Sequence, residues 1–397
     1  MESVLEGIRV LDLSRHISGP FGSVLLADFG AEVIRIERPG GEDDRFMGLQ
    51  APSGDGFMFL NMARNKKAIT LNFMASKKAF AILMELVGKA DVLIHNFSPG
   101  AVKKMGIGYE TISHINPALV YAEITGFGSE GPYTDRLGFD QIAQAMSGAM
   151  QITGFPQTPP QRAEVRYSDF GSGAFAALGI VMALYQRRLT GKGQRVETNL
   201  LKTGVVLNAT AVSEYEKMGS KRSRMGNRSW YTGPSDLYRT SDDRWVYISM
   251  VTRGLFGRFC RLIGRDDLPE RSDLATDYDR FQHRDEIDGL VTEWVAQRTA
   301  DEVLKELREA RLPAGVVNDV DEVAKDPQVV HDDALISMDY GEWGEFKLGG
   351  TPIGLSETPG VVRRPPPQVG EHNEDIYCGL LGYSGEKLAA LREEGVI

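Results

Sequence analysis

The chain has 397 residues, 42% hydrophobic and 25% charged, with a formal net charge of −10 and a pI near 5.3, as expected of a soluble protein of one or two domains. The excess of acidic residues argues against a nucleic-acid partner, and two cysteines, Cys260 and Cys378, are too few for a disulfide framework or a metal cluster. The acidic N-terminal sequence and the absence of an apolar run near the roughly 20 residues that span a bilayer predict a cytoplasmic protein without a membrane partner.

Short β-rich runs alternate with helical patterns in the first part of the chain. The predicted strands are 8–13, 32–37, 91–97 and 119–125, and the predicted helices are 21–28, 77–88 and 139–150. This alternation predicts an α/β fold, a doubly wound parallel sheet with helices on both faces. Ligands of such folds bind at the carboxyl ends of the strands, which points to residues 14–20, 38–41, 96–100 and 126–133.

A long apolar helix is predicted next, with Asp169 at its start in the segment RYSDFGSG and with TGKGQ at its end. A carboxylate at a helix N-terminus faces the positive end of the helix dipole, so we expect its ionised form to be favoured by about 0.3–1 kcal/mol. Such an oxygen can attack a carbonyl and form a covalent intermediate. The alternative is that Asp169 or Ser168 only caps the helix.

The pattern changes after about residue 219. A polar, basic stretch leads to a predicted hairpin, 237–240 and 245–250, and to amphipathic helices near 255–263, 285–296 and 300–310. These elements predict a smaller α+β domain from 225 to about 326. The proline-rich segment from Val329 suits an extended return to the large domain. We therefore divide the chain into 1–218, the first part of the large domain; 219–326, a linker and the small domain; and 327–397, the return linker and the last part of the large domain.

Basic and polar residues follow several predicted strands. Arg38 ends one of them, Asn96, Phe97 and Ser98 end another, and Lys103 and Lys104 come shortly afterwards. Arginine and lysine next to backbone N–H groups suit a phosphate-bearing ligand, although each of them alone is also an ordinary surface charge.

Other candidate motifs are weaker. His16 follows the first strand, where either a general base or a structural histidine could lie. The segment GFGSEG, 126–131, matches the dinucleotide pattern, but it lies in a late βα unit and a polar loop follows it, so we do not expect a nicotinamide or flavin cofactor. The six histidines have no metal-ligand spacing, and no metal is expected.

Six ordered blocks together resemble the class III CoA-transferases, the formyl-CoA and carnitine-CoA transferase group of CaiB/BaiF type. The blocks are LSRHISGPFGSVLLADFGAEVIRIERPGGED, ARNKKAITLN, HNFSPGAVKKMGIGYE, YAEITGFGSEGPY, RYSDFGSG and TGKGQRVETNLL. The resemblance is dense over roughly the first 215 residues and looser beyond them.

The resemblance implies a Rossmann-like large domain built from both chain ends, a smaller domain between linkers, and a homodimer whose subunits are interlocked like chain links. It implies that CoA is a substrate, with no tightly bound cofactor. The aspartate that matches Asp169 attacks an acyl-CoA thioester, and Asp140 lies close to it. The implied CoA-binding residues are Arg38, Asn72, Lys78, Asn96, Phe97, Ser98, Lys104 and Met105.

The chain also departs from the formyl-CoA transferase pattern. Ile17 replaces an active-site glutamine, Phe139 replaces a tyrosine, and the glycine-rich loop over the oxalate site is missing from MVTRGLFGRF, so we expect a larger carboxylate such as succinate, glutarate or malate. One alternative is a 2-methylacyl-CoA racemase, but its histidine is absent from Gly138-Phe139-Asp140, and a phenyl ring cannot move a proton. A non-catalytic CoA-binding protein is the second alternative.

Overall fold

The computed structural model describes residues 3–397, which form two compact units. The first unit contains the chain up to Gly148, Ala163–Ala209 and Pro327–Ile397, and the second contains Ala149–Arg162 and Thr210–Asp326. The sequence-based division kept 149–162 with the large domain. In the structure this segment is tied to the second unit, where the N–H of Gly226 donates to the carbonyl of Gly154 at 2.9 Å.

A six-stranded parallel sheet forms the centre of the first unit. Its strands are β1 (Arg9–Asp12), β2 (Glu32–Glu37), β3 (Lys67–Thr70), β4 (Val92–His95), β5 (Val120–Thr125) and β6 (Arg195–Asn199). Their order in space is β3-β2-β1-β4-β5-β6, so the chain changes direction across the sheet between β1 and β4. A ligand crevice is expected outside the carboxyl ends of these two strands. The structure confirms the predicted α/β class with a parallel sheet.

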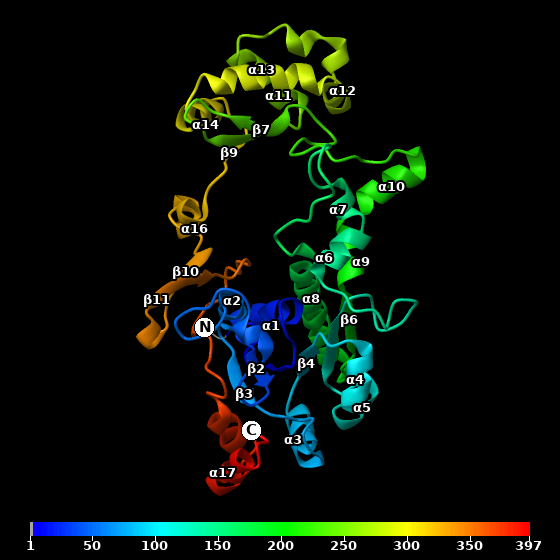
Figure 1. The fold of residues 1–397 in the computed structure, drawn as a ribbon, viewed down its shortest axis with the longest axis vertical. Helices are drawn as coiled ribbons and strands as arrows, with labels where there is room; N and C mark the ends of the chain where they lie inside the picture. The colour runs from blue at the N-terminus through cyan, green and yellow to red at the C-terminus, as the bar shows by residue number, and fades with distance from the viewer. Residues whose placement is uncertain (1–2) are drawn as a thin grey trace. The chain divides into compact units, whose positions relative to one another are not determined.

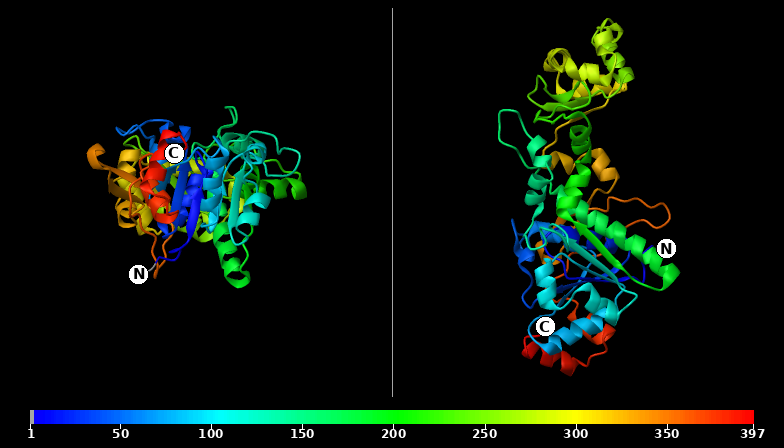
Figure 2. Two further views of the ribbon diagram at one scale, coloured as in Figure 1. Left: turned by 90° about the horizontal axis from the view of Figure 1, so that it is seen from below. Right: turned by 90° about the vertical axis from the view of Figure 1, so that its right-hand side faces the viewer.

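Helices cover both faces of this sheet (Figures 1 and 2). One face is covered by α3 (Lys77–Val87), α4 (Pro99–Met105), α5 (Tyr109–Ile115), the π-helix η5 (Asp375–Leu380) and α17 (Gly385–Glu393). The other face is covered by α1 (Ser18–Asp28), α6 (Asp140–Met146), α8 (Tyr167–Thr190) and α9 (Leu200–Leu207). The C-terminal segment lies beside α3, where the Tyr383 hydroxyl donates to Glu85 at 2.8 Å.

Helices α1 and α8 cross at two glycines. A Cβ atom on Gly173 would lie 2.3 Å from the carbonyl oxygen of Ser18, and one on Gly22 would lie 2.8 Å from the carbonyl oxygen of Gly173. Helix α1 begins at Ser18, three residues before the predicted start, because Pro20 lies in the first turn, where no backbone N–H is needed. The crossing therefore brings the first turn of α1 against the first turns of α8.

The C-terminal part of the first unit contains α16 (Pro327–His331) and a hairpin, β10 (Leu335–Asp339) and β11 (Glu345–Gly349), in a segment predicted only to be extended. The hairpin packs Tyr340 and Leu348 against Phe59 and Leu60 of α2 (Phe57–Ala63). The short helix η1 (Asp43–Phe46) lies after β2.

The second unit is an α+β fold. Its antiparallel sheet contains β7 (Ser235–Arg239), β8 (Trp245–Ser249) and β9 (Ala314–Val316). Its helices are α7 (Ala149–Ile152), α10 (Ala209–Met218), α11 (Arg253–Leu262), η2 (Leu268–Glu270), η3 (Ser272–Leu274), α12 (Asp277–Gln282), α13 (Arg284–Ala296), α14 (Ala300–Glu309) and α15 (Val320–Val323). The predicted hairpin and three predicted helices are present within one or two residues of their expected bounds.

Helix α8 has two different apolar sides. Its buried side, which includes Ala176 and Ile180, packs on α1 and the sheet. The other side exposes 41–68% of Phe175, Leu178, Met182, Tyr185 and Leu189. Among residues 3–397, α8 is the one helix whose length and composition would allow a membrane span, a test that core helices of soluble proteins also pass.

Candidate active site

Asp169 lies half-buried in the first turn of α8, and Asp140 lies fully buried at the start of α6. One oxygen of Asp140 accepts hydrogen bonds from the N–H groups of Ser168 at 2.8 Å and of Asp169 at 3.2 Å. The N-cap residue of α8, Arg166, makes no capping bond with its own side chain. Asp140 therefore caps α8 from a different helix.

Gln144, one turn after Asp140, holds this cap in place. Its amide nitrogen donates to the second oxygen of Asp140 at 2.5 Å. Its amide oxygen also accepts from the N–H of Ala163 at 2.8 Å, in the segment that leads into α8. The sequence analysis missed Gln144, although its i+4 spacing from Asp140 on a helix was a usable signal.

Burial and the nearby Asp140 carboxylate raise the pKa of Asp169 to about 7, while Arg166 and a hydrogen bond with Ser18 act in the opposite direction. The expectation that the helix start favours the ionised form is therefore wrong. Asp140 occupies the N–H groups at the start of α8 and adds a like charge, so the helix terminus gives Asp169 little compensation for burial. The result is a carboxylate that titrates near neutrality.

Ser18 is a second neighbour of Asp169 that the sequence analysis did not single out. Its hydroxyl lies near enough to the Asp169 carboxylate to lower its pKa, and it lies 3.4 Å from the side-chain amide nitrogen of Asn96. The close crossing at Gly22 and Gly173 places Ser18 there.

A cavity of about 300 Å³ opens at the carboxyl ends of β1, β4 and β5. Five predicted site residues line it, namely His16, Asn96, Phe97, Ser98 and Phe139. Arg15, Arg136 and Leu137 are among the other lining residues. The described lining contains two arginines and a histidine but no aspartate or glutamate, which suits an anionic ligand.

The residues after β4 are held by local hydrogen bonds. The side-chain oxygen of Asn96 accepts from the N–H of Arg15 at 2.8 Å, and its amide nitrogen donates to the carbonyl of Arg15 at 2.7 Å. Phe97 stacks on His95 with ring centroids 5.7 Å apart, and Ser98 caps α4. Asn96 thus joins the loops after β1 and β4, the two strands at the switch point.

The other predicted site residues, including Asp169 and Asp140 as described above, lie outside the cavity lining. Ile17 is buried as the N-cap of α1. Arg38, at the tip of β2, is exposed and ion-paired with Asp43. The N–H of Asn72 donates to the carbonyl of Val396 at 2.8 Å. The remaining three lie on two helices: Lys78 of α3 pairs with Glu394 at 2.7 Å, Lys104 of α4 is exposed, and Met105 packs against the core.

Two glycines shape the loop between β5 and α6. The backbones of Gly126 and Gly138 approach so closely that a Cβ atom on either one would lie 3.0 Å from the Cα of the other. The loop that contains GFGSEG therefore folds back on itself before α6 begins at Asp140. This contact brings Phe139 and Asp140 back to the tip of β5, which the dinucleotide pattern did not predict.

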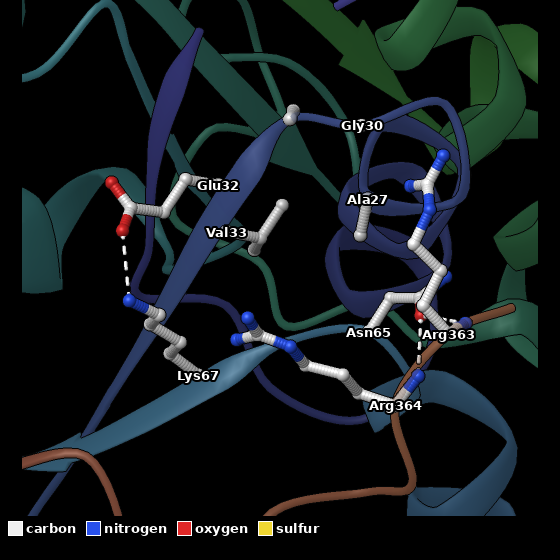
Figure 3. A pocket seen from close by; sticks show the side chains of 9 residues that line it. Ala27, Gly30, Glu32, Val33, Asn65, Lys67, Arg363 and Arg364 are labelled. Carbon is white, nitrogen blue, oxygen red and sulfur yellow. Dashed lines mark hydrogen bonds and ion pairs between the residues drawn. The ribbon is translucent and has the colours of Figure 1, made fainter. Parts of the chain in front are cut away.

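A separate cavity of about 220 Å³ lies at the amino ends of β2 and β3 (Figure 3). Arg363 and Arg364 extend along one side, and Lys67 pairs with Glu32 at 3.0 Å across the other. Because the strands are parallel, this cavity is at the edge of the sheet opposite Asp169 and does not belong to the candidate site. Within residues 3–397 no group of three or more His, Cys, Asp and Glu side chains could hold a metal ion.

The family model for CoA-transferase family III matches residues 5–373. The chain is 36% identical over 394 residues to succinyl-CoA–D-citramalate CoA-transferase of Chloroflexus aurantiacus, covering 99% of this chain and 98% of the relative. It is 37% identical over 411 residues to formyl-CoA:oxalate CoA-transferase of Streptomyces coelicolor, covering 99% of both chains. A solved CaiB/BaiF family protein from Brucella suis superposes with a TM-score of 0.83 at 32% identity, covering 96% of this chain and 100% of that one.

Proposed function

The chain belongs to CoA-transferase family III and is a transferase, and we propose that it moves CoA from an acyl-CoA donor to a carboxylic acid through covalent intermediates on Asp169. The observation that carries this proposal is the half-buried Asp169 carboxylate, whose pKa is near 7, between Ser18 and Asp140. A carboxylate of raised pKa is a stronger base, and so a better nucleophile, than an exposed one once it is ionised.

The proposed reaction has four steps. The Asp169 carboxylate attacks the thioester carbonyl, which gives a mixed anhydride and the CoA thiolate. The thiolate attacks the Asp169 carbonyl, which releases the donor acid and leaves an aspartyl-CoA thioester. The acceptor carboxylate attacks that thioester, which gives a second anhydride and the thiolate. The thiolate then attacks the acyl carbonyl, so the new acyl-CoA leaves and the Asp169 carboxylate is restored.

We propose that the unit built from both chain ends binds CoA. Asn96, Phe97 and Ser98 line the cavity at the strand tips, and Lys104 lies on the helix that Ser98 caps. The exposed Arg38 lies at the tip of β2 and pairs with Asp43 at the surface. Because an exposed pair of this kind is weak, the guanidinium can leave Asp43 and bind the phosphate end of CoA instead. Asp140 and Gln144 are positioning residues, because they fix the start of α8 rather than contact the substrate.

The substrate acids we propose are small dicarboxylates, with succinyl-CoA as the donor and an acid such as glutarate or malate as acceptor. The relative from Chloroflexus is named for succinyl-CoA and D-citramalate, and the cavity lining carries cationic groups without a carboxylate. Formyl transfer to oxalate is not proposed, because Ile17 and Phe139 differ from that pattern. We propose that the enzyme acts in the cytoplasm, in acyl-CoA metabolism.

The direct test is mass spectrometry of the protein after incubation with succinyl-CoA. We expect an aspartyl-CoA thioester at Asp169 that hydroxylamine removes. Absence of any adduct, together with absence of CoA exchange between succinyl-CoA and a panel of carboxylic acids, would contradict the proposal.

The same incubation in D₂O separates a transferase from a racemase. Phe139 cannot serve as an acid or base, but the His16 ring lies 6.2 Å from the Phe139 ring, so an imidazole is present nearby. A racemase would place solvent deuterium on C2 of a 2-methylacyl-CoA. We expect no such exchange, and rapid exchange without CoA transfer would favour the racemase.

The raised pKa of Asp169 predicts a pH dependence. Only the ionised carboxylate attacks, so kcat/KM for adduct formation is expected to rise tenfold per pH unit below about pH 7 and to level off above it. The measurement is adduct formation under single-turnover conditions between pH 5.5 and 8.5. A flat profile over that range would show that Asp169 is ionised throughout, contrary to the burial and charge around it.

We also propose a homodimer, which buries the exposed apolar side of α8 against a second copy. The five side chains Phe175, Leu178, Met182, Tyr185 and Leu189 form a continuous stripe on one side of the helix. Replacing Met182 by Glu is expected to shift the protein toward monomer in analytical ultracentrifugation. Ile115→Glu, at an exposed apolar position at the end of α5, is the control and should leave the mass unchanged.

A further inference from the structure

The backbone of His16 is strained, and buried groups hold it in place. Its φ angle is 64°, in the left-handed region that residues other than glycine rarely adopt. Its N–H donates to one oxygen of Asp44 at 2.9 Å, and the other oxygen of Asp44 accepts from Arg35 at 2.7 Å. Asp44 and Arg35 are both buried.

The residues before His16 are fixed as well. Asn96 binds the backbone N–H and carbonyl of Arg15, as described above, and Arg35 donates to the carbonyl of Ser14 at 3.3 Å. Strain of this kind persists only where the surroundings over-determine the conformation, and such residues cluster at functional sites. The loop after β1 therefore holds the backbone of His16 in this conformation.

That conformation places the imidazole at the cavity. His16 is exposed, lines the cavity and meets the edge of Phe139. Within residues 3–397 no group forms a hydrogen bond or an ion pair with its ring nitrogens, so both nitrogens are open to a ligand. By contrast, the Arg15 guanidinium already donates to the carbonyls of Leu13 and Ser14 and to Glu42.

His16 is also close to the reacting groups along the chain. Two residues later, the Ser18 hydroxyl lies near enough to Asp169 to lower its pKa. Phe139, which contacts the His16 ring, directly precedes Asp140, the carboxylate that binds the N–H of Asp169. Phe139 and Asp140 therefore link the imidazole to the start of α8, where Asp169 lies.

We propose that His16 is a specificity-determining residue, whose imidazole donates a hydrogen bond to the second carboxylate of a dicarboxylic substrate, and that Asp44 and Arg35 are its positioning residues. This rests on the proposed function, since it requires an acyl group on Asp169. A monocarboxylate of the same length would leave the imidazole without its partner. Such a site favours the dicarboxylate through the hydrogen bond that forms, and it disfavours the monocarboxylate because the imidazole is then left unpaired.

The test compares isotopically labelled succinate with butyrate as acceptors of CoA from succinyl-CoA, because the two acids have the same chain length and differ in one carboxylate, and the label makes transfer to succinate visible by mass. The variants are His16→Gly and His16→Asn, since glycine and asparagine tolerate a positive φ. We expect the succinate-to-butyrate ratio of kcat/KM to fall about tenfold or more in His16→Gly and less in His16→Asn, which keeps a donor. An unchanged ratio in both variants would overturn the proposal and would leave Arg136 as the remaining cavity cation to test.

The positioning role is tested with Asp44→Ala. If Asp44 acts through His16, this substitution lowers the same ratio in the wild-type background but not in the His16→Gly background. Equal losses for both acceptors in both backgrounds would indicate only structural damage and would reject the role of Asp44.

The two proposals fail in different ways. If wild-type protein forms no adduct and transfers no CoA to any acid, the proposed function fails. If it transfers CoA and the ratio does not respond to His16, only this inference fails.

Discussion

Replacing Asp169 by Asn is expected to lower CoA-transferase turnover by roughly 10³-fold or more, because the amide cannot attack the thioester. CoA should still bind, since the cavity residues Asn96, Phe97 and Ser98 remain. The measurements are steady-state transfer and calorimetric titration with CoA. Turnover within tenfold of wild type would exclude Asp169 as the nucleophile.

The same substitution should also change stability, and the sign follows from the raised pKa. The pKa of Asp169 is about 7 in the folded protein against its usual 3.8, so the folded state binds the proton more tightly. Stability contributed by this group is present below pH 3.8 and is lost as the pH rises toward 7. At pH 8, Asp169→Asn is therefore expected to be more stable than wild type by roughly 1–3 kcal/mol, with the difference shrinking as the pH falls from about 7 toward about 4. A variant that is inactive but also less stable at pH 8 would point to misfolding instead.

Replacing Lys66 by Ala is expected to destabilise the protein by about 3–5 kcal/mol, because it leaves a buried carboxylate without its main partner. Lys66 is buried in the first unit. Each of its three ammonium hydrogens has a hydrogen-bond acceptor. Its Nζ donates to Asp12 at 2.9 Å, to the carbonyl of Pro20 at 3.0 Å and to the Ser23 hydroxyl at 2.8 Å. Burial would raise the pKa of Asp12, but Lys66 and Arg35 hold it well below its usual range.

The next residue along the chain provides the control. Lys67 is half-buried and pairs with Glu32 and Asp375 near the surface, so Lys67→Ala should cost about 1 kcal/mol or less. Urea unfolding of both variants at one protein concentration measures the difference. Similar losses for the two lysines would show that the buried pair with Asp12 contributes no more than a surface pair.

Strands and helices with strong apolar patterns could be predicted from the sequence. The predicted strand 32–37 has the same bounds as β2 in the structure. Every residue after Glu32 is buried, and each is either apolar or ion-paired. Strand β6 was missed, because RVETN lies at the edge of the sheet, is only partly buried and carries four polar side chains. The start of α1 was placed three residues late, at residue 21, whereas Pro20 lies inside its first turn.

The candidate site could be predicted in its residues but not in its interactions. Asn96 and His16 were proposed from their place after strands, Asp169 from its place at a helix start, and Asp140 only from the family resemblance. The role of Asp140 as the cap of α8 depends on a tertiary contact over 28 residues, and it reverses the expected effect of the helix start on Asp169. The positive φ of His16 could not be predicted from the sequence, because histidine adopts it more often than most residues but still uncommonly.

The glycine contact between α1 and α8 fixes the distance between the helix starts that carry Ser18 and Asp169. At Gly22 and Gly173 the two helices touch through main-chain atoms, which have no alternative rotamers to exchange. We therefore expect the distance between α1 and α8 to stay the same when neighbouring side chains rearrange around different substrates. An added methyl group at position 173 would act as a wedge that separates the hydroxyl from the carboxylate while leaving both residues in the chain.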